Sequence, residues 1–350
     1  MNFVLTAAII LFSMPLFCSS HSIILYLANI ASESSNAELH QSLSALYSVP
    51  LSNHPHYPVL VAYDRKDRGY LTPDLRQTLA ERINATQRQI TDFDFFSLRG
   101  TTTICFVSIR GFRHIPWPFS MYTDIYQEKD PYYSRLGYSH MCRYWALTVF
   151  SQPFMRNVTS YLRLDTDTDL VAMPANPFEL LAAEPGLAYL ASVAYKEGTK
   201  QAEGLWETLL RFAFDADIHP WGLAPLSNRH ADDAHSDMDL KRMPLLEAVD
   251  VLYRRGYNRD YFYNNWEVSR VDIWTSPIYQ RLAKHIDAAG GIIARRWGDA
   301  PIRTLSLFLL RDAFAAMLNS SSDQPPFRQY RGLRVYHKAY HTTGGSELAF

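Results

Sequence analysis

Residues 161–169 of this 350-residue chain are Tyr161-Leu162-Arg163-Leu164-Asp165-Thr166-Asp167-Thr168-Asp169, which predicts a short strand ending in three carboxylates at alternate positions. Residues i and i+2 of an extended backbone point to the same side, so Asp165 and Asp167 can converge on one cation. Mg²⁺ and Mn²⁺ prefer oxygen ligands, which substrate phosphates often complete. Open α/β sheets bind ligands at the carboxyl ends of their strands. The stretch therefore indicates a nucleoside-diphosphate site, although an isolated Asp-x-Asp is also common in solvated acidic turns.

The residues before this strand alternate between two kinds of pattern. Short apolar runs predict buried strands, and longer segments with apolar residues at helical spacing predict helices. This β-α-β-α-β order predicts a parallel sheet covered by helices, and no repeat or linker divides the chain, so we expect one α/β domain. The predicted strands are residues 23–28, 58–63 and 102–107; the predicted helices are residues 34–48, 72–84 and 138–150; the predicted loops are residues 117–133 and 197–244.

Composition limits the classes of protein. With 47% hydrophobic and 20% charged residues, the chain has the composition of a globular protein. The formal net charge is -1 and no run of Lys or Arg occurs, so the charge gives no reason to expect nucleic-acid binding. The 22 Tyr, 19 Phe and 7 Trp suit sugar binding, because aromatic faces pack on the C–H surfaces of pyranose rings. They suit a well-filled core equally well.

The N-terminus predicts entry into the secretory pathway. Residues 4–17 are almost wholly apolar, and small residues follow that permit cleavage after Ser20. A spanning helix needs about 20 apolar residues and a signal-peptide core about 7–15, so a cleaved signal and a short signal-anchor both remain open. We expect a leader at residues 1–20 and one catalytic domain at residues 21–350. Three glycosylation sequons agree with a luminal location, at Asn84, Asn157 and Asn319.

The chain has three cysteines. Cys18 lies in the leader, which leaves Cys105 and Cys142 as the only possible intrachain pair of a mature protein. We therefore expect stability to come from the core rather than from a disulfide framework.

Three segments together carry a family resemblance. They are Tyr138-Ser139-His140-Met141-Cys142-Arg143-Tyr144, the strand at 161–167, and the block 257–301 with Asn265-Trp266-Glu267 and Arg296-Trp297-Gly298-Asp299-Ala300-Pro301. In this order they resemble the fungal α-1,2-mannosyltransferases of the Golgi (glycosyltransferase family 15, the glycolipid 2-alpha-mannosyltransferases), which elongate O- and N-linked mannans. The similarity covers most of residues 23–342, and the six-residue match at 296–301 is far more specific than any Asp-x-Asp.

The resemblance implies a GT-A type α/β fold with a Rossmann-like mixed sheet, GDP-mannose as donor, Mn²⁺ as cofactor, and retention of the anomeric configuration. The implied partners are GDP-mannose and a mannose-terminated glycan acceptor in the secretory lumen, with membrane contact only through an uncleaved N-terminal segment. The family's Glu-Pro-Asp motif falls on Asp165-Thr166-Asp167, which keeps both carboxylates. Its late metal-ligand His falls on His337, with His341 as the fallback.

The resemblance also implies roles around the sugar. The family's proposed nucleophile falls on Glu267, which would attack or shield the anomeric carbon. Asp299 and Tyr138 match further site positions, and Glu197 lies near a Tyr-Glu pair of the family. Arg143 is a candidate diphosphate partner, with a structural role for it and for His140 as the alternative. Trp266 and Trp297 are expected to be pocket walls.

Two alternatives stay open. The chain could use another donor sugar on the same fold, or it could be a non-catalytic glycan-binding relative. Retention of Asp165, Asp167, Glu267, Asp299 and a late His together argues against the second. Residues 197–244, with an acidic run containing histidines, could form an acceptor lid, a secondary metal site or a mobile solvated loop.

Overall fold

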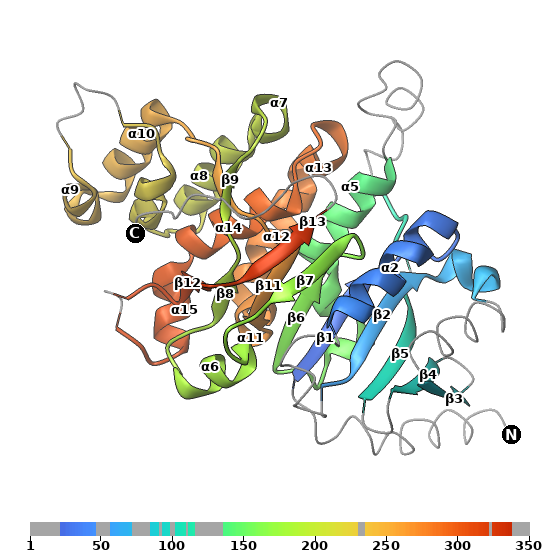
Figure 1. The fold of residues 1–350 in the computed structure, drawn as a ribbon. Helices are drawn as coiled ribbons and strands as arrows, with labels where there is room; N and C mark the ends of the chain where they lie inside the picture. The colour runs from blue at the N-terminus through green and yellow to red at the C-terminus, as the bar shows by residue number, and fades with distance from the viewer. Residues whose placement is uncertain are drawn as a thin grey trace, which may run out of the picture.

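In the computed structural model, the described residues are 22–46, 57–71, 85–90, 93–98, 102–109, 111–115, 136–229, 235–321 and 324–337. A nine-stranded sheet runs through them, with helices on both faces (Figure 1). The strand order is β12-β8-β11-β6-β1-β2-β5-β4-β3. The predicted α/β sheet with covering helices is therefore present.

The centre of the sheet consists of four parallel strands. They are β1 (Ser22–Leu27), β2 (Val59–Asp64), β5 (Thr102–Ile109) and β6 (Ser160–Leu164). Every residue of β2 and of β6 is buried, as expected for strands covered on both faces. The chain adds β2 and β6 on opposite sides of β1. This arrangement creates a switch point at the carboxyl ends of β1 and β6, where such sheets bind ligands.

The edges of the sheet are mixed. On one side β11 (Trp266–Arg270) runs antiparallel to both β6 and β8 (Tyr189–Ala191), and β12 (Phe327–Gln329) pairs with β8. On the other side a hairpin of β3 (Ala85–Ile90) and β4 (Phe93–Leu98) extends β5. This hairpin was not predicted from the sequence.

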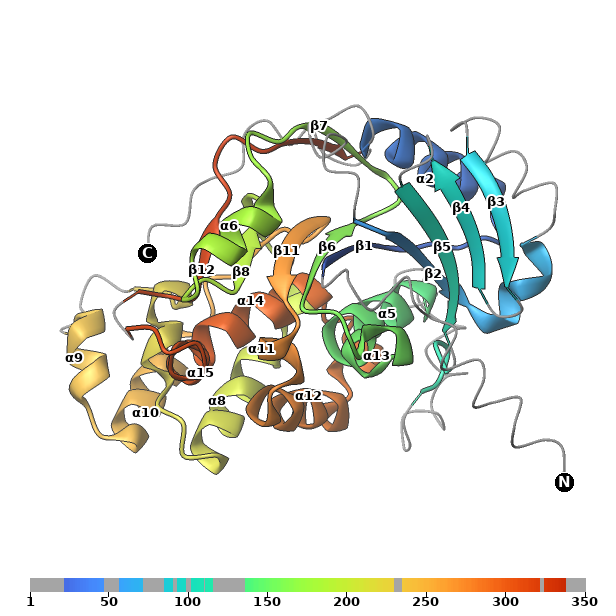
Figure 2. The same cartoon turned by 90° about the horizontal axis from the view of Figure 1, so that it is seen from below.

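Two apolar clusters flank the sheet, and Figure 2 shows the corresponding layers. One layer contains α2 (Glu33–Leu46) and α6 (Pro177–Ala183). The larger layer contains the remaining long helices, packed around the buried Trp145 and Trp274. Its helices are α5 (Leu136–Arg143), α8 (Leu205–Asp215), α10 (Leu245–Arg255), α11 (Asp272–Thr275), α12 (Pro277–Ala289), α13 (Gly291–Ala294), α14 (Asp299–Leu309) and α15 (Arg311–Met317).

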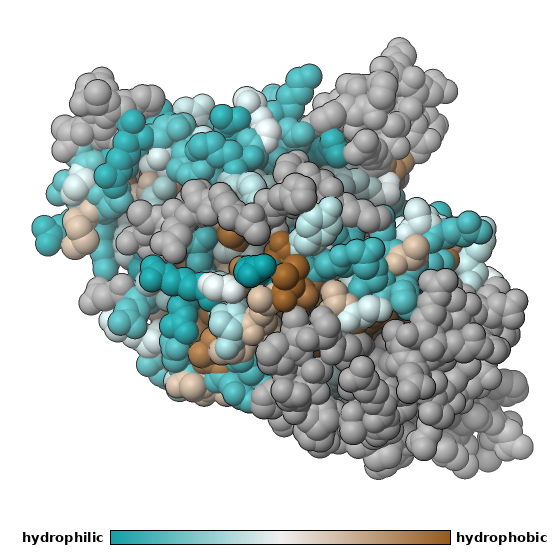
Figure 3. Space-filling model, in the orientation of Figure 1, coloured by the Kyte–Doolittle hydropathy of each residue, from teal (hydrophilic) through white to brown (hydrophobic). Residues whose placement is uncertain are grey.

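Two short antiparallel ribbons stand outside the main sheet. One pairs β7 (Thr168–Ala172) with β13 (Arg334–His337), and the other pairs β9 (Ala194–Lys196) with β10 (Asp260–Phe262). In Figure 3 a small hydrophobic patch lies over the first ribbon, where Val171 is 50% exposed. No helix among the described residues is long and apolar enough to cross a membrane.

Several predictions differ from the structure. The predicted helix at 138–150 is α-helical only to Arg143, then continues as a π-helical turn and a 3-10 turn to Ser151. The predicted loop at 197–244 is wrong for most of its length, because α7 (Thr199–Ala202), α8, a 3-10 helix (Pro220–Leu226) and α9 (Asp237–Arg242) pack there. Cys142 is free and fully buried, so the possible disulfide does not form. The leader, the predicted helix at 72–84 and the predicted loop at 117–133 lie outside the described residues.

Candidate active site

A cavity of about 580 Å³ opens at the carboxyl ends of β1 and β6. It lies where the sheet topology predicts ligand binding. Predicted site residues from four separate parts of the chain line it: Tyr138, Asp165, Asp167, Glu197 and Asp299. Leu27, Glu38, Trp145, Arg163, Gln201, Tyr261, Tyr263, Asn264 and Arg296 also line it.

The acidic turn at its centre is held by backbone and side-chain contacts. The Asp165 N–H donates to the Asn265 carbonyl (3.0 Å), and the Thr168 N–H donates to the Asp165 carbonyl (3.1 Å). Thr168 is fully buried; its hydroxyl accepts from the Asn265 amide (3.2 Å), and its carbonyl accepts from the Ser42 hydroxyl of α2. These contacts fix the turn between β6 and β7. Asp165 and Asp167 therefore both face the cavity.

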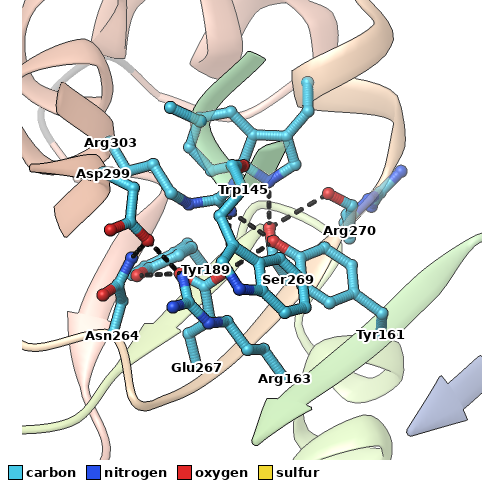
Figure 4. A network of polar contacts seen from close by, with 12 residues as sticks. Trp145, Tyr161, Arg163, Tyr189, Asn264, Glu267, Ser269, Arg270, Asp299 and Arg303 are labelled. Atoms are coloured by element: carbon cyan, nitrogen blue, oxygen red, sulfur yellow. Dashed lines mark hydrogen bonds and ion pairs between the residues drawn. The ribbon is translucent and has the colours of Figure 1, made fainter. Parts of the chain in front are cut away.

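Arg163 connects two of the carboxylates. Its Nε lies 2.9 Å from Asp165 Oδ1. Its Nη1 lies 2.5 Å from Asp299 Oδ2, a contact drawn in Figure 4. The guanidinium is 1% exposed and stacks 4.2 Å above the Trp145 ring. The Asn264 amide donates to the same Asp299 oxygen (2.8 Å). Asp299, the first residue of α14, is thus held in place by two donors.

The lining of the cavity carries excess negative charge. Five carboxylates line it (Glu38, Asp165, Asp167, Glu197 and Asp299), against the two guanidinium groups of Arg163 and Arg296. Burial raises the pKa of Asp165 to about 6, with Arg163 opposing this rise and Asp167 adding to it. Burial also raises the pKa of Glu197. A carboxylate whose charged form is disfavoured by its surroundings is stabilised by a bound cation, so the cavity favours cation binding.

Asp165 and Asp167 are suited to bind a divalent cation, because their carboxylates supply the hard oxygen ligands that Mn²⁺ accepts. The backbone of His337 pairs with Thr168 across the β7–β13 ribbon, which brings the predicted third ligand next to the acidic turn. The His337 side chain and His341 lie outside the description. Among the side chains that the structure describes, no group of three His, Cys, Asp or Glu is arranged around a metal site. The two described carboxylates therefore fit a site that phosphate oxygens of a bound nucleotide would help to complete.

Glu267 is placed differently from the prediction. It has no exposed surface and does not line the cavity. The hydroxyls of Tyr161 and Tyr189 donate to its two oxygens (2.8 and 2.7 Å), and Arg303 forms an ion pair with it at 3.1 Å (Figure 4). Glu267 of β11 lies opposite Arg163 of β6, and Tyr161, Tyr189 and Arg303 enclose it on that face of the sheet. It does not line the cavity in this position, and its role at the anomeric carbon stays a prediction.

Arg143 also departs from the prediction. Its Nε and Nη2 contact the two oxygens of Asp287 at 2.7 and 2.8 Å, which joins α5 to α12. It does not line the cavity, so the structural alternative describes it better than the role of a diphosphate partner. The buried His140, one turn earlier, packs against Phe112. Its pKa is lowered to about 4, first by burial and then by the neighbouring charges of Arg143 and Arg113.

Three of the four aromatic residues that line the cavity, Trp145, Tyr261 and Tyr263, were not identified from the sequence. Trp266 stacks on Tyr330 in the opposite layer, and Trp297 packs against Gly291, so neither tryptophan is a wall of the cavity. Tyr261 and Tyr263 line it instead. Tyr138 does line it, as expected, with the Arg296 guanidinium 4.5 Å above its ring.

Arg163, Asn264 and Arg296 are further lining residues to which the sequence had assigned no role. Signals existed for two of them, because Arg163 lies on the strand that leads into the acidic turn and Arg296 opens the six-residue motif at 296–301. Asn264 contacts Asp299, a partner that is distant in sequence.

Comparison with known proteins identifies the family of the chain. The family model described as glycolipid 2-alpha-mannosyltransferase matches residues 120–317, more than half of the chain. The O-glycoside alpha-1,2-mannosyltransferase omh1 of Schizosaccharomyces pombe is 25% identical over 185 residues, which are 52% of this chain and 41% of that protein. Alpha-1,2 mannosyltransferase KTR1 of Saccharomyces cerevisiae is 25% identical over 214 residues, 60% of this chain and 46% of that protein. The chain thus spans about half the length of the curated relatives it matches.

Solved structures show the same fold. Core-mannan synthase A of Aspergillus fumigatus, in an Mn/GDP form, has a TM-score of 0.65 and 17% identity and covers 91% of this chain and 75% of its own. The mannosyltransferase Ktr4p of Saccharomyces cerevisiae, in complex with GDP, has a TM-score of 0.64 and 18% identity, with coverage of 93% and 72%. The predicted GT-A type fold is confirmed by these likenesses. With the matched family model, they show that the chain belongs to the glycolipid 2-alpha-mannosyltransferase family of glycosyltransferases.

Proposed function

We propose that this protein transfers mannose from GDP-mannose to a mannoside acceptor of a glycan, forming an α-1,2 linkage with retention of configuration. The observation that carries the proposal is the acidic cavity at the end of β6, in a chain of this family. Relatives named as alpha-1,2-mannosyltransferases support the linkage, and solved neighbours that hold GDP and Mn support the donor.

Asp165 and Asp167, with His337 beside them, are the residues that would hold Mn²⁺. When bound, the metal ion supplies a Lewis acid that offsets the charge of the leaving diphosphate. Arg163 keeps Asp165 oriented, because its Nε donates a hydrogen bond to Asp165 Oδ1. Stacking on Trp145 holds the guanidinium in place. Preorganised charges of this kind need no rearrangement during the reaction.

Asp299 takes the role that the sequence had given to Glu267. It is the buried carboxylate that lines the cavity, and Arg163 and Asn264 orient it. We assign to it the stabilisation of positive charge that develops at the anomeric carbon. Glu267 is a positioning residue in this proposal, since it orders Tyr161, Tyr189 and Arg303 behind the cavity.

The proposal keeps the expected organisation of the chain: a leader at residues 1–20, one catalytic domain at residues 21–350, and a Golgi or other secretory lumen as location. Asn157 and Asn319, the sequon positions within the described residues, are both exposed, as glycan attachment requires.

The test is a transfer assay with the purified protein. GDP-mannose and methyl α-mannoside would be incubated with Mn²⁺ or with EDTA, and NMR would give the linkage and anomeric configuration of the product. Asp167→Ala should lose metal-dependent transfer, whereas Asp169→Ala, a matched carboxylate outside the cavity lining, should retain it. Turnover of a different nucleotide sugar would refute the donor assignment. Absence of any nucleotide binding would favour the non-catalytic alternative.

A further inference from the structure

Three tyrosines share one face of the β9–β10 ribbon. Tyr195 of β9 lies directly opposite Tyr261 of β10 in the antiparallel register. Residues opposite each other in a ribbon point to the same side, and so do residues two positions apart in one strand. Tyr263 directly follows β10, and its ring contacts place it beside the other two, 5.1 Å from Tyr195 and 6.5 Å from Tyr261, at steep angles to both.

The ribbon is fixed to the core by the residue between two of these tyrosines. Phe262 is fully buried against Phe308 and Phe327, and its N–H donates to the Thr304 hydroxyl of α14 (2.9 Å). The Tyr263 N–H donates to the Val193 carbonyl (2.9 Å). The tyrosines are half-buried rather than packed in the core, and Tyr261 and Tyr263 line the cavity. They therefore form a rigid aromatic wall.

The lining of the cavity comes from two separate groups of elements. Leu27 at the end of β1 and Glu38 of α2 line one side of the acidic turn. Tyr261 and Tyr263 line the cavity from the β9–β10 ribbon, with α7 next to it, on the other flank of the molecule from α2 (Figure 1). Glu197 and Gln201, from the ribbon end and α7, add hydrogen-bonding groups beside the tyrosines. The cavity thus has an aromatic and polar compartment beyond the acidic turn.

We propose that Tyr261 and Tyr263 form the acceptor platform, stacking on the apolar face of a terminal hexopyranoside while Glu197 and Gln201 bind its hydroxyls. Tyr195 supports the edge of Tyr263. The proposal rests on the proposed function and names the substrate side of the same site. Aromatic rings suit this task because their faces bury the C–H surface of a sugar without leaving polar groups unpaired.

The test separates ring stacking from hydrogen bonding. Tyr261→Phe and Tyr263→Phe keep the ring, whereas Tyr261→Leu and Tyr263→Leu remove it. The matched control is Tyr253→Leu, which alters a 60% exposed tyrosine on α10 outside the cavity lining. Initial rates would be measured against methyl α-mannoside at saturating GDP-mannose and Mn²⁺, beside hydrolysis of GDP-mannose without acceptor. Thermal unfolding would check that each variant is folded.

The leucine variants should raise the KM for methyl α-mannoside by about tenfold, the size expected from loss of one aromatic contact. The KM for GDP-mannose, the hydrolysis rate, and the phenylalanine and control variants should stay near wild type. An unchanged acceptor KM in both leucine variants would overturn the proposal. So would a rise in the KM for GDP-mannose instead, because the rings would then contact the nucleotide.

Failure of the proposed function is recognised separately. If the wild type does not turn over GDP-mannose, binding of methyl α-mannoside in the presence of Mn²⁺ and GDP would be followed by saturation-transfer NMR. Binding that is lost in the leucine variants and kept in the phenylalanine variants would support the platform without catalysis. Equal binding in all variants, or none in the wild type, would refute it.

Discussion

Arg163 donates to Asp299 across 2.5 Å, although the two residues are 136 positions apart in the chain. The contact joins the strand that leads into the acidic turn to the first residue of α14. Both side chains are almost fully buried, so the pair is kept only while sheet and helix pack together. Because Arg163 also contacts Asp165, the position of Asp165 is coupled to that of Asp299 across the cavity.

Glu267→Gln should lower stability more than catalysis. The variant keeps the shape of the side chain but removes the charge that pairs with the buried Arg303, which should cost roughly 3 kcal/mol of unfolding free energy. The rate of transfer per folded molecule should fall less than tenfold, because Glu267 does not line the cavity. Urea unfolding and the transfer assay measure the two effects.

Glu184→Gln, which breaks an exposed pair with Arg328, should change stability by about 1 kcal/mol or less. Loss of activity with unchanged stability would restore the nucleophile assignment.

Arg143→Gln should leave the affinity for GDP unchanged. Arg143 contacts Asp287 rather than the cavity, so its loss removes the link between α5 and α12 and should cost about 1–3 kcal/mol. Asp287→Asn should produce a similar loss of stability, since it removes the other half of the same pair. Calorimetric titration with GDP and Mn²⁺ is the measurement that decides. A tenfold weaker affinity in Arg143→Gln alone would return this residue to the diphosphate site.

The stability of the protein should fall in acid partly through His140. Its pKa in the folded protein is lowered to about 4 by burial and by the charges of Arg143 and Arg113, whereas an unfolded histidine titrates near about 6.5. Between these values the unfolded chain binds more protons, so this contribution is complete above pH 6.5 and is lost as the pH falls toward 4. The effect is on the order of 3 kcal/mol. Unfolding curves at pH 7 and pH 4.5 should therefore differ less in His140→Gln than in wild type. Equal pH dependence in both proteins would show that folding does not lower the pKa of His140.

Gly222→Ala should be strongly destabilising, although it lies in a segment predicted to be a loop. A Cβ atom at this position would lie 2.1 Å from the Phe308 carbonyl oxygen, so the 3-10 helix would have to move away from α14. Overpacking of this kind costs roughly 3 kcal/mol. Gly137→Ala is the matched comparison, because a Cβ in α5 would meet nothing within 4 Å and should stabilise the helix by up to about 1 kcal/mol. Equal melting temperatures for the two variants would contradict the packing of the 3-10 helix on α14.

The sequence alone was sufficient for the features that depend on local pattern. Apolar runs predicted β1, β2, β5 and β6, and helical spacing predicted α2. The Asp-x-Asp pattern pointed to the cavity, although Asp165 and Asp167 lie in the turn after β6 and not on an extended strand. Family resemblance added Tyr138, Glu197 and Asp299, which all line the cavity. The two ribbons, the burial of Glu267, the Arg143–Asp287 pair and the tyrosine wall depended on tertiary structure. The physical reason is that periodicity records which side of an element is buried, whereas the partner of a buried charge or ring is set by segments that meet only when sheet and helices pack.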